Sequence, residues 1–249
     1  SLNPVRHYGL DVGLLQEGDP ADFVIVRDLK QFEILRTYID GLLVAEGGKS
    51  LIETQPPERL NRFYCSRLQL SDLSVPAEGK QIRVIEVWEG QIVTGQSTSQ
   101  IAPGTPEVDS CVEDDVLKLV VVNRYKNARP AIAFVRGFGL QRGALASSVA
   151  HDSHNIVAVG VDDEDLLAAI NAIIDAQGGL AASSAGKTEC LPLPIAGLMS
   201  AGSCAEVGKS YANLGRLSQS YGCELAAPFM TLSFLSLPVI PALKLTDLG

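Results

Sequence analysis

The stretch "AIAFVRGFGLQRGALASSVAHDSHNIVAVG", residues 131–160, decides the fold class of this chain. It contains three short apolar runs separated by glycine-rich or polar turns, a pattern typical of successive β-strands. The segment "DDEDLLAAINAIIDAQGG", residues 162–179, follows directly, and its leucines and isoleucines recur at spacings of three and four, as on one face of a helix. Strands mixed with helices predict an α/β class with a mixed α+β arrangement.

The flanking residues continue this pattern. The apolar run at 116–125 predicts a further strand, and 180–194 predicts two strands joined by a glycine turn. A second helix is predicted over 204–220, and its spacing places four residues on the inner face: Val207, Tyr211, Leu214 and Leu217. The apolar run 225–243 has a length near that of a membrane span, but three prolines interrupt it, so we expect a buried strand or irregular core segment.

The first half of the chain predicts shorter and more polar elements. We expect the end of a helix at 3–10, a turn and strand at 18–26, a hairpin at 33–48 around Asp40-Gly41, two strands at 81–95 around Glu89-Gly90, and a surface loop at 95–110. The segment 46–62 is polar and rich in turn residues, which makes it the best candidate for a linker.

The composition excludes some classes of function. The net charge is −9, and without a basic cluster we expect no nucleic-acid partner. We also expect no membrane partner. Five widely spaced cysteines without a CxxC pair argue against a disulfide framework and a zinc knuckle, and they favour a cytoplasmic location. No Walker A loop or GxGxxG motif occurs.

Two blocks of the sequence carry a resemblance to known families. The segments "GLDVGLLQEGDPADFVIV" (9–26) and "TYIDGLLVAEGG" (37–48) resemble the closing part of the amidohydrolase superfamily, with its pattern at Gly18, Ala21, Asp22 and Phe23. The segments "FVRGFGLQRGALASSVAHDSHNIVAVG", "LPLPIAGLMS" and "PFMTLSFLSLPVIPALKLTD" resemble the C-terminal domain of bacterial adenine deaminases.

This resemblance implies a domain organisation. Residues 1–50 would be the end of an amidohydrolase barrel and the return strands of its small β-sandwich, 51–66 a linker, and 67–249 the adenine deaminase C-terminal domain. Because the N-terminal strands of the sandwich lie outside the sequence, we expect unpaired strand edges in 18–48. In an isolated chain, this segment is then expected to be disordered, exchanged between copies or paired with another copy.

The resemblance also implies a reaction. In the intact enzyme, adenine as substrate and water would give hypoxanthine and ammonia, with a binuclear Mn or Fe centre that activates the water. The family holds that centre through an H-x-H pair and further barrel residues. None of these barrel ligands has a counterpart here, and His7 falls on a surface position of the family pattern. We therefore expect no cofactor in this chain and no activity of the chain alone. The incomplete sandwich and the apolar run 225–243 separately suggest a homo-oligomer.

Two other functions remain open from the sequence. The chain could be a stand-alone binding or assembly module that uses the same fold. It could also belong to another amidohydrolase that acts on a nucleobase or a cyclic amide, although the blocks at 131–160 and 191–246 favour adenine deaminases.

The best candidate site within the chain is the segment 151–155, with His151, Asp152, His154 and Asn155. One interpretation is a polar loop at a strand end, whose side chains satisfy nearby backbone groups. A second is an accessory metal site, with His151 and His154 as candidate ligands. A third is a loop that reaches the barrel mouth of the intact enzyme and closes the adenine pocket or carries a proton.

Other polar residues are weaker candidates. Arg124, Arg136 and Arg142 could hold anions, but single arginines are usually solvated or paired at the surface. Cys204 begins a predicted helix, where a thiol can be activated. The acidic run 162–165 is expected to cap its helix and interact with the helix dipole.

Overall fold

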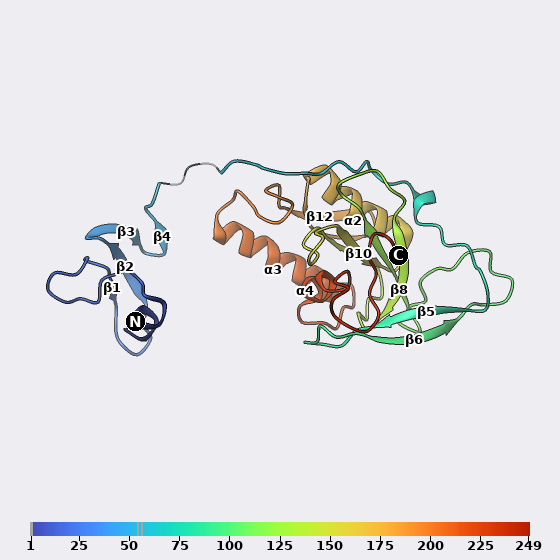
Figure 1. Ribbon diagram of the computed structural model, residues 1–249, viewed down its shortest axis with the longest axis horizontal. Helices are drawn as coiled ribbons and strands as arrows, with labels where there is room; N and C mark the ends of the chain where they lie inside the picture. Colours follow the sequence, from blue (N-terminus) through green and yellow to red (C-terminus); the bar gives the residue numbers. More distant parts are fainter. Residues whose placement is uncertain (1, 54, 56) are drawn as a thin grey trace. The chain divides into compact units, whose positions relative to one another are not determined.

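The chain folds into two compact units, residues 1–56 and 57–249, separated within the segment expected to be a linker (Figure 1). The computed structural model describes residues 2–53, 55 and 57–249. Both units are built around β-sheets, and the second also carries three α-helices, so the predicted α/β class is confirmed. The domain bounds predicted from the resemblance, 1–50, 51–66 and 67–249, remain predictions.

The first unit is a short helix followed by a four-stranded antiparallel sheet in the order β1-β2-β3-β4. Its elements are α1 (Leu2–Tyr8), β1 (Phe23–Val26), β2 (Ile34–Ile39), β3 (Leu42–Glu46) and β4 (Lys49–Ser50). The predicted hairpin turn is confirmed: Asp40 and Gly41 both have positive φ, 50° and 75°, which a tight two-residue turn requires.

Asp22 ties the loop before β1 to this hairpin turn. Its carboxylate accepts hydrogen bonds from the backbone N–H of Gly13 (2.8 Å) and of Asp40 (2.7 Å). These two bonds lower the pKa of Asp22, because they favour the ionised form. A side chain at Gly13 would overlap the carbonyl of Pro20, so the loop needs glycine there. The aspartate of the pattern at Gly18, Ala21, Asp22 and Phe23 thus has a structural role, because Asp22 joins the loop to the hairpin turn.

Residues 23–50 form a four-stranded sheet in the structure, and disorder of this segment in an isolated chain stays a prediction. β1 and β4 are its outer strands, each paired on one side among the described residues. Several large apolar side chains of the unit are exposed: Val24, Ile25, Leu29, Phe32, Ile34, Ile39 and Leu42. Pairing or exchange with another copy stays a prediction.

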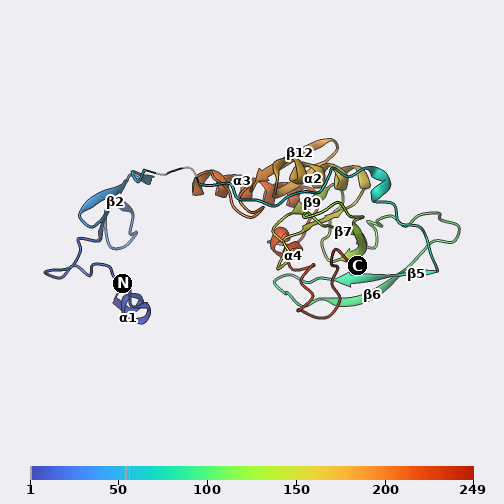
Figure 2. The same ribbon diagram turned by 45° about the horizontal axis from the view of Figure 1, so that its top comes forward.

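The second unit contains a mixed eight-stranded sheet in the order β12-β11-β9-β10-β7-β8-β5-β6 (Figure 2). Only the β5–β8 pair is parallel. The strands are β5 (Gln81–Glu86), β6 (Gly95–Gln100), β7 (Leu117–Val122), β8 (Ala131–Arg136), β9 (Ala144–Ser147), β10 (Ile156–Gly160), β11 (Gly179–Ser184) and β12 (Lys187–Pro192). A 3₁₀ turn, η1 (Leu70–Asp72), precedes them.

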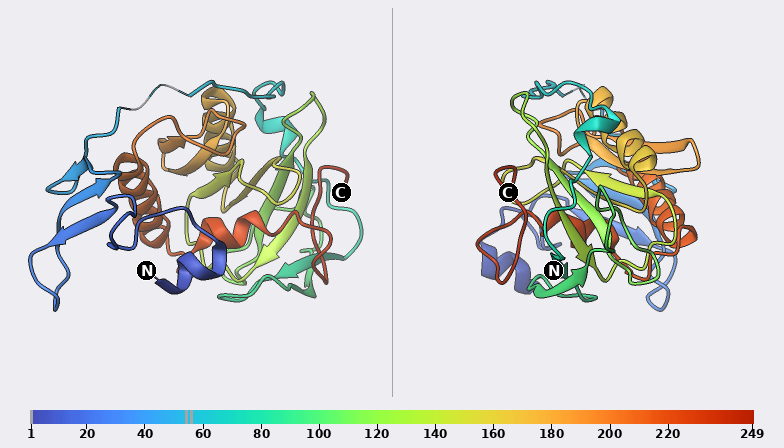
Figure 3. Two further views of the ribbon diagram at one scale, coloured as in Figure 1. Left: turned by 60° about the vertical axis from the view of Figure 1, so that its left-hand side comes forward. Right: turned by 90° about the vertical axis from the view of Figure 1, so that its right-hand side faces the viewer.

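Helices cover both faces of this sheet (Figure 3). The helices are α2 (Asp163–Ala176), α3 (Cys204–Ser220) and α4 (Pro228–Ser233). Alternate residues of β7 enter different cores: Leu119 packs with residues of α3 and α4, whereas Val120 packs with those of α2. Because successive side chains of a strand point to opposite faces, a strand between two layers must be apolar throughout.

Two details of the sequence prediction are wrong. The second strand of the β5 hairpin is β6, Gly95–Gln100, where we expected a loop. β6 is an edge strand of polar residues, so apolar patterning could not reveal it. Tyr211 is 42% exposed, although it was placed on the inner face of α3. Gln177 adopts the left-handed conformation that ends α2.

The apolar run 225–243 packs on the core, and its irregular part was expected, but residues Pro228–Ser233 form the short helix α4, which was not predicted. Leu232 and Leu235 are fully or almost fully buried there. Across the described residues, no helix has both the length and the apolar character needed to cross a bilayer. All five cysteines are free, as the absence of a disulfide pattern predicted.

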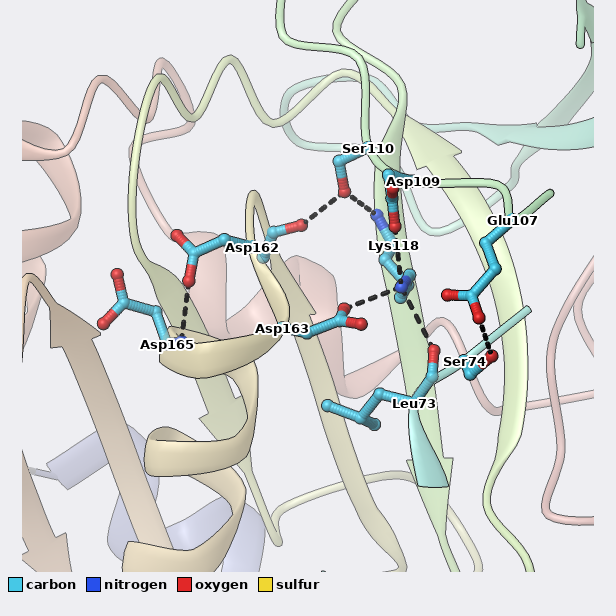
Figure 4. A network of polar contacts seen from close by, with 10 residues as sticks. Leu73, Ser74, Glu107, Asp109, Ser110, Lys118, Asp162, Asp163 and Asp165 are labelled. Atoms are coloured by element: carbon cyan, nitrogen blue, oxygen red, sulfur yellow. Dashed lines mark hydrogen bonds and ion pairs between the residues drawn. The ribbon is translucent and has the colours of Figure 1, made fainter. Parts of the chain in front are cut away.

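Lys118 is one of the largest fully buried side chains of the second unit, and the sequence analysis did not single it out. It lies on the α2 face of β7, where the alternation would otherwise place an apolar residue (Figure 4). Its ammonium group contacts Asp163 at 2.6 Å and Asp109 at 3.6 Å, and it donates to the carbonyl of Leu73 at 3.1 Å. The pair with Asp163 fastens the start of α2 to the central sheet.

We predict that Asp163→Asn lowers the free energy of unfolding by roughly 3 kcal/mol, because it leaves the buried ammonium without its closest counter-charge. Lys118→Met should cost less, since the Asp163 carboxylate is partly exposed and can be solvated. Urea denaturation measures both. Glu164→Gln, an exposed change in the same helical turn, is the matched control. Equal stability of Asp163→Asn and Glu164→Gln would contradict the prediction.

Candidate functional site: the loop between β9 and β10

The loop that carries His151, Asp152, His154 and Asn155 connects β9 to β10. β10 pairs with β7 so that Ile156 lies opposite Val122. The loop therefore meets the residues that follow β7, which begin with Asn123, at one end of the sheet. The sequence placed this loop correctly at a strand end, but it could not show which other segment lies beside it.

Backbone contacts hold the loop at several points. The N–H of His151 donates to the carbonyl of Ser233 (2.9 Å), and the N–H of His154 donates to that of Ala150 (2.6 Å). The Tyr125 hydroxyl donates to the carbonyl of Ser153 at 2.8 Å. His154 itself has a positive φ of 52°, a conformation that its neighbours must enforce. The loop is therefore a fixed turn.

The four candidate residues do not share one environment. Asn155 is buried, and its side-chain oxygen accepts a hydrogen bond from the N–H of Arg124 at 3.3 Å, as expected for a residue that satisfies nearby backbone. Asp152 is exposed. The rings of His151 and His154 lie 6.3 Å apart between centroids, and the His151 ring also packs against Phe234 at 4.7 Å.

His154 has an unusual electrostatic position. Its Nδ1 is buried, and it has no hydrogen-bond partner among the residues that the structure describes. Burial lowers the pKa of His154, the charges of Arg124 and His151 lower it further, and Asp152 opposes the shift. The loop thus favours a neutral imidazole with one unused nitrogen.

The accessory metal site at His151 and His154 stays a prediction, for which the loop itself supplies two imidazoles. Among residues 2–53, 55 and 57–249, no three His, Cys, Asp or Glu side chains lie close enough together to hold a metal ion. Two imidazoles whose ring centroids are 6.3 Å apart offer fewer ligands than a stable protein site provides. We therefore assign no chemical step of this chain to a bound metal.

Arg124 is the principal site residue that the sequence analysis misjudged. We expected a solvated or surface-paired arginine, but only 4% of its surface is exposed. Its guanidinium lies over the rings of Phe63 (5.6 Å) and Tyr125 (4.8 Å). Its position two residues beyond the buried strand β7 was the available signal, since the loops at the end of a buried strand are themselves partly covered.

Ser148 links the start of the loop to the segment 195–198. Its hydroxyl donates to the carbonyl of Gly197 (2.6 Å) and accepts from the N–H of Gly179 (2.8 Å). The neighbouring carbonyl of Ala196 accepts a hydrogen bond from Arg124 at 2.8 Å. Segments far apart in the sequence thus meet around Arg124.

The other sequence candidates lie elsewhere. Arg136 donates to the carbonyl of Asp114, and Arg142 donates to that of Ser220, each at 2.9 Å. Cys204 is exposed at the start of α3. Asp162 accepts a hydrogen bond from the N–H of Asp165 and so caps α2, which confirms the role expected for this acidic run.

Comparison with known families identifies both parts of the chain. The family model described as the adenine deaminase C-terminal domain matches residues 91–249. The model described as the amidohydrolase family matches residues 1–44. The first match covers more than half of the chain and includes the whole β9–β10 loop.

Curated relatives agree with this match over the entire chain. Proteins named adenine deaminase are 51% identical in Salinibacter ruber, 47% in a Sulfurovum species and 44% in Borreliella burgdorferi, each across 100% of this chain. The chain spans a little under half the length of these relatives, 45–46%. The chain belongs to the adenine deaminase C-terminal domain family.

Proposed function

We propose that this chain is the C-terminal part of an adenine deaminase, which converts adenine and water to hypoxanthine and ammonia. The observation that carries the proposal is the 51% identity to a protein named adenine deaminase across the whole chain. Residues 1–44 match the amidohydrolase family, which supports a hydrolase with the catalytic barrel encoded before this segment.

We propose further that the binuclear Mn or Fe centre of the intact enzyme is held by residues outside this chain. The chain has three histidines and no H-x-H pair, so the ligands typical of the resembled barrel have no counterpart in it. The separation of the two loop imidazoles is consistent with this division. On this proposal the isolated chain has no deaminase activity.

The β9–β10 loop is proposed to border the adenine pocket of the intact enzyme. Support comes from the two imidazoles, which form no hydrogen bonds within the described part of the chain, while the backbone around them is held in place. Both histidines are only partly buried, so their rings can contact a partner from outside the chain. A neutral imidazole is the form that can accept a proton during catalysis.

Assembly and location follow the same proposal. The exposed apolar side chains of the first unit favour coverage by the missing strands of the intact protein or by another copy in a homo-oligomer. Five free cysteines favour a reducing compartment such as the cytoplasm.

The first test is turnover. We expect the purified chain, supplied anaerobically with Mn²⁺ or Fe²⁺, to produce no hypoxanthine from adenine, whereas the same protein extended upstream through the barrel should produce it. In the extended protein, His154→Gln should lower kcat about tenfold or more if the loop acts at the pocket. His7→Gln, a change at an exposed histidine, is the control.

Three outcomes would contradict these proposals. Hypoxanthine formation by the isolated chain, lost on replacement of His151 or His154, would make the loop an active site in its own right. An extended, folded and metal-loaded protein without activity on adenine would exclude the proposed substrate. Unchanged kinetics of His154→Gln would restrict the loop to a structural role.

A second test uses pH. A folded-state pKa of His154 below the unfolded value near 6.5 means that the unfolded chain binds the proton first. This contribution to stability is present above about pH 6.5 and is lost as the pH falls through the folded-state pKa. We expect the Tm of the wild-type chain to fall more between pH 7.5 and 5.0 than that of His154→Gln.

The control for this comparison is again His7→Gln, which should follow the wild type because His7 is exposed. Carboxylates that titrate in the same range contribute equally to all three proteins, so only the difference in Tm between them is interpreted. Parallel curves for the wild type and His154→Gln would show that the loop does not disfavour the charged imidazole.

A further inference from the structure

Arg124 is a buried positive charge without an anionic partner among the described residues. Its guanidinium donates to the Ala196 carbonyl (2.8 Å) and to the Tyr125 hydroxyl (3.0 Å), and its Nε is buried without a hydrogen-bond partner among the described residues. The guanidinium has five N–H donors, and these two hydrogen bonds engage only two of them. No Asp or Glu oxygen in the described chain lies within 4.0 Å of it, although six other ion pairs form.

Such an arrangement is unfavourable unless something compensates for it. A buried charge loses its hydration, and neutral hydrogen bonds together with the faces of Phe63 and Tyr125 recover only part of that loss. Arginine stays charged at any pH that proteins meet, so it cannot escape by losing a proton. An oxyanion with two acceptor oxygens would supply both the missing charge and the missing acceptors.

The guanidinium borders a concavity through which an anion could reach it. This hollow has a volume of about 420 Å³, and its lining consists of Leu60, Asn61, Arg62, Arg124, Tyr125 and Ala196. Arg62 is exposed at its rim and supplies a second positive charge. The chain has a net charge of −9, so two arginines in one hollow, without a carboxylate among the lining residues, are a local departure from the overall charge.

The backbone around Arg124 is shaped to accept it. Gly197 has a positive φ of 70°, and a side chain at this position would overlap Nη1 of Arg124. The Asn61 amide donates to the carbonyl of Gln177 at 2.6 Å, which holds that wall of the hollow. The arginine therefore occupies a space that three separate segments leave for it.

We propose that this concavity binds a small oxyanion, a phosphate or carboxylate group, with Arg124 at its base and Arg62 at its rim. The guanidinium of Arg124 is fixed by Ala196 and Tyr125, so its remaining N–H groups are oriented before the ligand arrives. The hollow lies within the second unit. The site therefore needs no residue of the barrel, but through Asn155 it adjoins the β9–β10 loop that the proposed function places at the adenine pocket.

The experiment is a titration of the purified 249-residue chain by isothermal calorimetry. Inorganic phosphate and acetate are the two probes, with sodium chloride at the same ionic strength as the reference. We expect saturable binding of at least one probe and a matching rise in Tm, while chloride gives neither. Phosphate binding alone would assign the site to phosphate groups, and acetate binding alone would assign it to carboxylates.

Variants locate the site. Arg62→Gln, an exposed change that should leave the fold intact, is expected to weaken binding at least fivefold, and Arg124→Gln should abolish it. Arg129→Gln removes one exposed positive charge outside this hollow and should bind as the wild type does. Because Arg124 is buried, the folding of Arg124→Gln is checked by circular dichroism and by its Tm. If Arg124→Gln is unfolded, the binding result of Arg62→Gln decides the test.

Either of two results would overturn the proposal. Neither probe binding saturably to the wild type would show that the guanidinium is compensated within the chain. Equal weakening by Arg62→Gln and Arg129→Gln would show that the anion responds to overall charge. Because none of these readouts is deaminase activity, their failure is distinguishable from failure of the proposed function.

Discussion

Burial of the central sheet on both faces is the constraint on which the second unit depends. β7 and β10 are buried at every position, so their side chains alternate between the helical layer on one face of the sheet and the layer on the other face. Lys118 is the exception, and its position is possible only because the first turn of α2 presents Asp163 to it. The start of α2, the centre of the sheet and the η1 segment are joined through this one ammonium group.

Much of this architecture could be predicted from the sequence. The bounds of α3 agree with the expected 204–220, and the turns at Asp40-Gly41 and Ala185-Gly186 connect the strands they were expected to connect. These elements carry local signals: helical periodicity, a capping residue or a turn that needs positive φ. The family was also accessible, because its motifs are continuous stretches of sequence.

The remaining features depend on contacts between distant residues. β6 consists of polar residues and is a strand because β5 lies beside it. Lys118 and Arg124 both look like solvated charges in the sequence, since nothing local shows that α2 or the segment at Ala196 covers them. For the β9–β10 loop, local sequence predicted a polar turn, whereas the contacts with Arg124 and Ser233 come from the fold.

The parallel pairing of β5 with β8 has a consequence for how the second unit folds. Val84 lies opposite Phe134, fifty positions further along the chain, and β7 must already occupy the other side of β8 for the sheet to be continuous. Closing so long a loop costs more chain entropy than forming the antiparallel contacts of β9 with β10. We therefore expect β7, β9, β10 and α2 to assemble first and the β5–β6 hairpin to dock last, in a slower kinetic phase.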